Sequence, residues 1–211
     1  MIKSTMIVLA TRNKGKIAEI SALLEDRDII KPVTLKNLDD FGPMPDVEED
    51  GNTFDENAYK KAGFYARILG LPCLADDSGL TVTALDGAPG VLSARYAGEN
   101  ATDEERCTKL LRAMEGQSDR QAAFECVLSF AVPTGQALTY EARCEGVITE
   151  RPIGANGFGY DPLFYYPPLK KTFAQLPREE KSRVSHRGLA LNEFKNEFDN
   201  VLIWLQRMTP A

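Results

Sequence analysis

Two adjacent aspartates, Asp76 and Asp77, end a short apolar run at residues 71–75 and are followed at once by Ser78. The run has the length and composition of a buried strand, so we expect the acids on a tight turn at the edge of a core. A buried carboxylate without a partner is strongly destabilising, so the pair requires a bound cation, a shared proton or a solvent-filled cleft. These residues alone leave an acidic turn without chemistry as the alternative.

Length and charge limit what such a site can serve. The chain has 211 residues and 43% apolar content, which predicts one domain over residues 1–211. It carries 25 Lys and Arg against 31 Asp and Glu, a net charge of -6. This balance argues against broad affinity for nucleic acid or an anionic membrane, so a polyanionic small molecule must meet a local basic cluster.

Cysteine usage and the N-terminus predict a cytoplasmic protein. The four cysteines are far apart and form no C-x-x-C pair, which is typical of a reduced protein. They are Cys73, Cys107, Cys126 and Cys144. Residues 1–11 enter a strand-like run directly and show neither an export signal nor a membrane span.

Apolar runs alternate with helical patterns along the chain. Strands are predicted at residues 6–10, 29–35, 71–75, 81–84 and 163–165, with a long hairpin from 122–132 and 137–147. The run at 81–84 is either the continuation or the partner of the strand at 71–75. Helices are predicted after the first strand, behind the capping boxes that begin at Thr53 and Thr102, and at the C-terminus. The C-terminal helix has one apolar stripe, formed by Phe194, Phe198, Val201 and Leu205. We therefore expect an α/β fold whose mixed central sheet is flanked by helices.

The segment of residues 11–16 places three cations at the start of the first helix. Acids are the usual choice there, because the helix dipole favours negative charge at its N-terminus. Backbone N–H groups, Asn13 and the lysines suit a phosphate chain, although neither a Walker loop nor a dinucleotide fingerprint is present. A solvated basic turn is the alternative.

An acidic loop at residues 47–51 precedes the second helix, which carries Glu56 and Lys61. Together with Asp76 and Asp77 it offers oxygen ligands for Mg²⁺, which takes one or two carboxylates, waters and substrate phosphate oxygens. Most acidic loops are simply solvated, and this alternative stays open.

Two later segments offer contacts for an aromatic, charged ligand. Phe158 lies between two glycines and can stack on a base where the backbone approaches closely, or the segment is a plain turn. Residues 181–188 contain the only histidine, His186, which excludes a multi-histidine zinc site. A solvated cationic turn before the last helix is the alternative here.

Six segments, in order and spacing, closely resemble the inosine triphosphate pyrophosphatase family: residues 11–16, 48–49 with 53–58, 76–80, 87–96, 157–161 and 185–188. The resemblance covers nearly the whole chain. It implies hydrolysis of ITP, dITP and XTP to the monophosphate and pyrophosphate with Mg²⁺ by a homodimer. It also implies a long mixed sheet dividing two lobes, with the nucleotide in the cleft between them.

The same resemblance implies roles for individual residues. Asp77 corresponds to the general base, Glu49 and Asp77 to the metal ligands, and Lys16 and Asp76 to further catalytic groups. The triphosphate contacts implied are Thr11, Arg12, Asn13, Lys14, Gly15 and Lys16, supported by Lys61 and Ser78. The base and remaining phosphate contacts implied are Phe158, Gly159, Tyr160, Asp161, Lys181, His186 and Arg187. Arg12 stands where the family frequently has glycine, so its side chain either points away from the phosphates or adds a contact.

A mechanism follows for such a site. Water oriented by Asp77 and polarised by Mg²⁺ attacks the α-phosphorus, and lysines offset the charge on departing pyrophosphate. Arg187 or His186 can donate to the 6-oxo group of hypoxanthine or xanthine, whereas adenine presents a donor there.

Three rival functions remain at this point. An aspartyl-nucleophile phosphatase also uses paired acids, but its D-x-D spacing is absent. The others are a purine nucleotide-binding regulator without turnover and a pyrophosphatase of similar fold that acts on other modified nucleotides.

Overall fold

The computed structural model describes residues 5–24 and 33–208, which form a seven-stranded sheet flanked by helices. The strand order is β2-β1-β3-β4-β5-β6-β7. The strands are β1 Thr5–Leu9, β2 Val33–Asn37, β3 Cys73–Val82, β4 Gln121–Ala131, β5 Ala137–Ile148, β6 Phe164–Tyr166 and β7 Lys171–Thr172. β1 pairs in parallel with β2 and β3, whereas β6 is antiparallel to β5 and β7. The sheet is therefore mixed, and the predicted α/β class is confirmed.

Helices and short helical turns lie between the strands. The α-helices are α1 Lys14–Leu24, α2 Phe54–Leu69, α3 Asp103–Ala113, α4 Arg178–Val184, α5 His186–Asn196 and α6 Phe198–Met208. Of the 3₁₀ turns, η1 spans Leu38–Phe41 and η3 spans Gly90–Arg95. None of the helices in the described ranges is both long and apolar enough to span a membrane.

The chain divides into two compact units. The first consists of Met1–Asp77, Val127–Glu141 and Ala190–Ala211. The second consists of Ser78–Cys126 and Ala142–Leu189. Strands β3, β4 and β5 each contribute residues to both units, and the division in β3 falls between Asp77 and Ser78.

The first unit packs small apolar side chains of β1 and β3 against α2. Val8, Cys73 and Ala75 are fully buried beside Ala62 and Ala66 of that helix. The short side chains of α2 allow close approach of helix and strands, and this places Lys61, their neighbour on α2, beside β3.

The second unit has an aromatic core. Phe124 of β4 lies within 4.6 Å of Phe164 and within 5.8 Å of Phe173, measured between ring centroids. Leu80 and Val82 of β3 are fully buried in the same cluster. Strand β3 thus contributes to a separate core in each unit.

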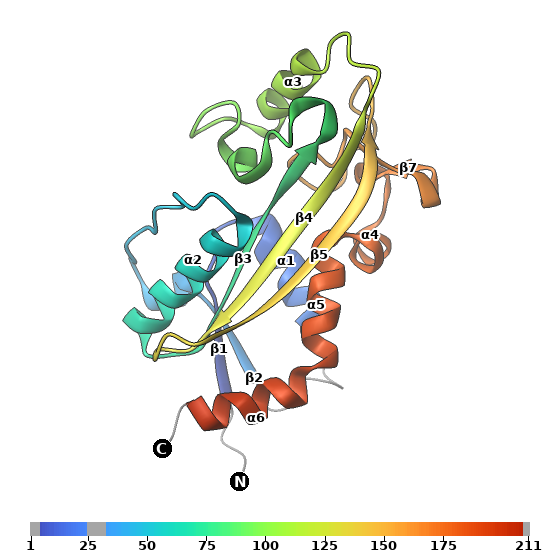
Figure 1. Cartoon of the computed structure of the whole chain (residues 1–211). Helices are drawn as coiled ribbons and strands as arrows, with labels where there is room; N and C mark the ends of the chain where they lie inside the picture. The colour runs from blue at the N-terminus through green and yellow to red at the C-terminus, as the bar shows by residue number, and fades with distance from the viewer. Residues whose placement is uncertain (1–4, 25–32, 209–211) are drawn as a thin grey trace. The chain divides into compact units, whose positions relative to one another are not determined.

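Several predicted elements are confirmed, and two are wrong. The hairpin is present, and Figure 1 shows β4 and β5 running side by side. The predicted C-terminal helix is instead two helices, α5 and α6, which run in different directions on either side of Glu197 (Figure 1). All four residues of the predicted stripe are nevertheless buried. Of the strand predicted at residues 29–35, residues 29–32 lie outside the described part of the chain.

The predicted tight turn at Asp76-Asp77-Ser78 is also wrong. β3 continues without interruption from Cys73 to Val82, so both acids lie inside a strand. Successive side chains of a strand point to opposite faces, so Asp76 and Asp77 meet different neighbours. Gly79 and the charged residues resemble a turn in sequence, but the strand is held in a sheet between β1 and β4.

Candidate active site

Asp76 forms an ion pair with a lysine at the start of α1. The Asp76 carboxylate is fully buried and contacts Lys16 Nζ, which also donates to the Asp76 carbonyl oxygen at 3.3 Å. Lys16 lies in the first turn of α1, where its backbone N–H donates to Asn13 Oδ1 at 3.1 Å. Thr11 Oγ1 in turn accepts from the Asn13 N–H at 3.2 Å. These side-chain caps fix the backbone of residues 11–16, and the two contacts of Lys16 with Asp76 join this loop to β3.

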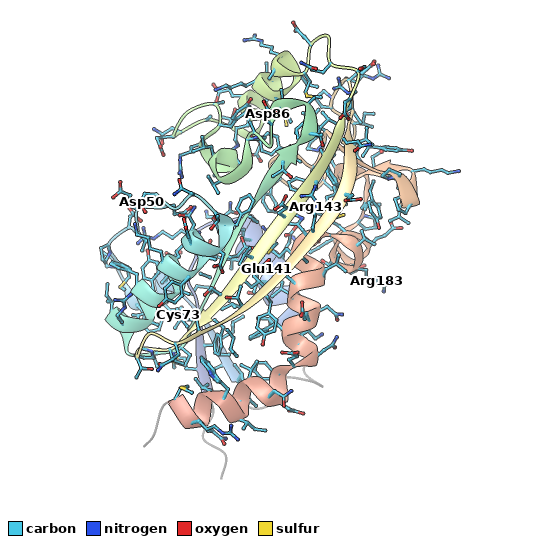
Figure 2. All side chains as sticks on the ribbon, viewed as in Figure 1. Asp50, Cys73, Asp86, Glu141, Arg143 and Arg183 are labelled. Atoms are coloured by element: carbon cyan, nitrogen blue, oxygen red, sulfur yellow. The ribbon has the colours of Figure 1, made fainter. Side chains whose placement is uncertain are left out.

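Asp77 shares a second lysine with the acidic loop. Lys61 Nζ of α2 lies 2.7 Å from Glu49 Oε1 and 3.3 Å from Asp77 Oδ1. Glu49 is half-buried whereas Glu48 is exposed, so Glu49 is the loop carboxylate that joins Asp77. Asp50, labelled in the same loop in Figure 2, pairs with Lys60 instead and is well exposed.

Burial and neighbouring charges shift the pKa values of Asp77 and Lys61. It raises the pKa of Asp77 above its ordinary value, although Lys61 and Lys16 oppose the shift. Burial acts to lower the pKa of Lys61, but attraction to Asp77 and Glu49 outweighs it, so the pKa of this amine is raised. A carboxylate with a raised pKa beside a permanently charged ammonium is suited to accept a proton.

Arg12 is directed toward the segment that leads to the acidic loop. Its guanidinium contacts the Asp46 carboxylate, and Nη2 donates to the Met44 carbonyl oxygen at 2.5 Å. Tyr65 of α2 anchors the same segment, because its hydroxyl donates to the Pro45 carbonyl oxygen at 3.0 Å. The basic loop and the acidic loop are thereby tied together.

In the second unit, Asp161 organises the glycine-flanked loop. Its Oδ2 accepts from the Phe158 N–H at 2.9 Å and lies 2.6 Å from Lys181 Nζ. The same ammonium lies 4.9 Å from the centre of the Phe158 ring, a cation–π distance. Gly157 has φ +76°, and a Cβ there would collide with the Asp161 carboxylate, so glycine is required.

Ser78, His186 and Arg187 lie near this loop. Arg187 Nη2 donates to Ser78 Oγ at 2.8 Å, and its guanidinium carbon lies 5.7 Å from the Phe158 ring centre. The His186 ring stacks on Phe124 with centroids 4.6 Å apart. The alternative of a solvated cationic turn is excluded, because Lys181 lies on α4, α5 begins at His186, and the side chains of Lys181, His186 and Arg187 are buried. Helical backbone and burial hold these three side chains more rigidly than a solvated turn would.

Each unit therefore gathers some of the residues singled out in the sequence. Thr11, Arg12, Asn13, Lys16, Glu49, Lys61, Asp76 and Asp77 belong to the first unit, and Ser78, Phe158, Gly159, Tyr160, Asp161, Lys181, His186 and Arg187 to the second. Lys14 is exposed and Gly15 half-buried at the start of α1. Sequence reasoning missed Phe124, which has no local signal because it reads as an ordinary strand residue.

Comparison with known proteins assigns the family. The model of the Ham1 family matches residues 7–197. The chain belongs to the Ham1 family. Among similar members, the dITP/XTP pyrophosphatase of Syntrophobacter fumaroxidans is 59% identical over 99% of this chain and 88% of its own length. The dITP/XTP pyrophosphatase of Geobacter sulfurreducens is 53% identical over 91% of this chain and 96% of its own length.

Solved Ham1 structures have the same fold. A HAM1 protein from Coxiella burnetii superposes with a TM-score of 0.84 at 46% identity, covering 93% of this chain and 99% of that one. The Ham1 protein of Staphylococcus aureus superposes with a TM-score of 0.83 at 41% identity. The match covers 93% of this chain and 100% of that one. The resemblance to the inosine triphosphate pyrophosphatase family is thus confirmed at the level of family and fold.

Proposed function

We propose that this Ham1 family protein hydrolyses dITP, XTP and ITP to the nucleoside monophosphate and pyrophosphate. The observation that carries the proposal is the buried Asp77, whose raised pKa suits a general base and which shares Lys61 with Glu49. The names of its relatives support the substrate class, because eight curated relatives at 45–59% identity are all named dITP/XTP pyrophosphatase.

The donor set fits Mg²⁺. Glu49 and Asp77 converge on one cation, the Lys61 ammonium, so their oxygens already face a common positive charge. Within residues 5–24 and 33–208, no group of three or more His, Cys, Asp and Glu side chains is placed to hold a metal. Two carboxylates suit Mg²⁺, which fills its remaining positions with water and phosphate oxygens. When bound, the ion supplies charge neutralisation and polarisation of water.

The residues of the first unit have complementary tasks. Asp77 orients a water molecule toward the α-phosphorus and takes its proton as the bond to the departing pyrophosphate breaks. Lys16 and Lys61 offset negative charge on the phosphates, together with Thr11, Asn13, Lys14 and the backbone of Gly15. Asp76 holds Lys16 in place.

The second unit supplies the base contacts. Phe158, with Lys181 and Arg187 near its ring, offers a stacking surface for a purine. His186 and Arg187 donate to the 6-oxo group, Ser78 holds Arg187, and Asp161 holds Lys181. Gly159 and Tyr160 shape the loop.

Arg12 has a positioning role in this proposal. Its contacts with Asp46 and Met44 join the phosphate-binding loop to the segment before Glu49. It takes the first of the two alternatives given by the sequence, a side chain directed away from the phosphates.

Two further assignments complete the proposal. The protein acts in the cytoplasm, where its four buried cysteine thiols stay reduced. It also acts as a homodimer. Sedimentation velocity at micromolar concentration tests this assignment by measuring the mass of the protein in solution.

The substrate assay measures pyrophosphate release from dITP, XTP, dATP, GTP and dUTP with Mg²⁺. We expect dITP and XTP to be turned over at least about tenfold faster than the others, because only they combine a 6-oxo acceptor with no 2-amino group on a purine. In Asp77→Asn we expect the rate of pyrophosphate release from dITP to fall about a hundredfold or more, which is the usual contribution of a general base. Equal rates across the five nucleotides contradict the proposal.

A further inference from the structure

Helix α3 holds both main-chain polar groups of Gly159. Asp103 Oδ2 accepts from the Gly159 N–H at 2.7 Å. Cys107 Sγ donates to the Gly159 carbonyl oxygen at 3.4 Å, a normal length for a sulfur donor. Asp103 and Cys107 are four positions apart, so they lie on one face of α3. We name these two contacts the α3 clamp.

The chemical states of both side chains suit these bonds. Burial, chiefly, raises the pKa of Cys107 to about 11, so the thiol keeps its proton at neutral pH and acts as a donor. Asp103 is the first residue of α3, and Thr102 and Glu105 form a capping box there. Arg106 pairs with Asp103 and donates to the Ala94 carbonyl oxygen at 2.7 Å. The carboxylate is thus fixed in direction.

The next residue of the loop is also anchored. The Tyr160 hydroxyl donates to the Ser93 carbonyl oxygen at 2.9 Å, and Ser93 Oγ accepts from the Leu80 N–H at 2.9 Å. Burial raises the pKa of Tyr160, so this phenol stays a donor. The loop that carries Phe158 is therefore connected through Ser93 to β3, two residues after Ser78.

A pocket of about 470 Å³ lies between α3 and this loop. Asp103, Cys107 and Gly159 line it, with Leu111, Pro152 and Pro162 among the other residues. Close packing does not fill this space, so loss of the clamp leaves the loop room to move. The α3 clamp is thus a direct restraint on Gly159 on the side of the loop that lines this pocket.

We infer that Asp103 and Cys107 are positioning residues for nucleobase binding, acting through Gly159 to fix the Phe158 ring. This inference rests on the proposed function. It assigns α3 a part in base affinity that is separate from the phosphate contacts given to Lys16 and Lys61 in the proposed function, because those two lysines belong to the first unit.

The test compares two probes by isothermal titration calorimetry. IMP carries the base and one phosphate, whereas inorganic tripolyphosphate has no base and reports on the phosphate site alone. Asp103→Ala and Cys107→Ala are each expected to weaken the affinity for IMP about fivefold, which is the effect of one hydrogen bond. The affinity for tripolyphosphate should change less than about twofold. Cys107→Ser keeps a donor and should restore IMP affinity.

Glu104→Ala is the matched control, because Glu104 also lies in the first turn of α3 and lines the pocket. It should leave both affinities unchanged. Hydrogen exchange over residues 157–161 gives a second readout, faster in Asp103→Ala and unchanged in Glu104→Ala. Unchanged IMP affinity in both clamp variants, or equal weakening of both probes, overturns the inference. Failure of the proposed function itself is seen separately, as a wild-type protein that neither binds IMP nor hydrolyses dITP.

Discussion

Lys61 is the side chain on which two carboxylates depend. It is almost completely buried, and both Glu49 and Asp77 contact its ammonium. Lys61→Met removes their common partner, so the free energy of unfolding should fall by about 3 kcal/mol, as for other broken buried ion pairs. Urea unfolding without metal measures this, and Mg²⁺ should recover part of the loss.

The neighbouring Lys60 gives a matched control. Its partner Asp50 is exposed, so Lys60→Met should leave the urea midpoint close to that of the wild type. If Lys60→Met and Lys61→Met lower the midpoint equally, the contacts of Lys61 with Glu49 and Asp77 do not have the role assigned to them.

Asp77 carries a stability cost that follows from its burial. Its pKa is raised above the ordinary 3.8, so the folded state favours the protonated form, and ionised Asp77 destabilises the fold at neutral pH. Asp77→Asn should therefore unfold at a higher temperature than the wild type at pH 7 without metal. The difference should vanish as the pH falls through the raised folded pKa to below 3.8.

Asp76→Asn is the contrasting variant. Asp76 is fully buried against Lys16, and its loss leaves that lysine without its main partner, so the melting temperature should fall. Mg²⁺ should raise the melting temperature of the wild type and of Asp76→Asn but not of Asp77→Asn. A lower melting temperature of Asp77→Asn at pH 7 would contradict the assigned direction of the pKa.

At the scale of elements, α2 connects the acidic loop to β3. Thr53 Oγ1 accepts from the Glu56 N–H at 3.1 Å and caps the helix. Thr53→Ala should lower the free energy of unfolding by about 1 kcal/mol, measured in urea, whereas Thr53→Asp retains a cap and should not. A loss of stability in Thr53→Asp equal to that in Thr53→Ala would show that the cap is not the cause.

Elements with strong local signals were predicted well from the sequence. The capping box at Thr102 is complete, and the box at Thr53 is half correct, because Glu56 accepts from the Asn52 N–H at 2.6 Å. The break between α5 and α6 at Glu197 has neither glycine nor proline to announce it. The tight turn predicted at Asp-Ser-Gly was wrong because sheet pairing overrides the turn-like sequence, and the run at residues 81–82 continues β3.

At the scale of the whole molecule, the site depends on contacts between residues far apart in sequence. Arg187 and Ser78 are 109 positions apart, and Lys16 and Asp76 are 60 apart. Residue types at the site could be selected from the sequence because acids that follow directly on an apolar run and cations at a helix start break local rules. The pairing of these residues could not be predicted from the sequence, because spacing along the chain does not specify which cation contacts which acid.

The buried thiols predict how stability depends on alkaline pH. Burial raises the pKa of Cys73 and of Cys144 to about 12, above the ordinary 9.0. The folded state therefore keeps these protons while the unfolded thiols ionise, so stability is lost between pH 9 and 12. Cys73→Ala removes one thiol, and its stability deficit relative to the wild type should shrink from pH 9 to pH 10 by about 1 kcal/mol. A deficit that stays constant in urea unfolding at both pH values contradicts the assignment.

The position of water attack tests the proposed chemistry most directly. Hydrolysis of dITP in H₂¹⁸O with Mg²⁺, followed by mass spectrometry of both products, locates the bond that breaks. Attack at the α-phosphorus places one ¹⁸O in dIMP and leaves the pyrophosphate unlabelled. Labelled pyrophosphate, or release of orthophosphate with dIDP, would contradict the account and favour a phosphatase.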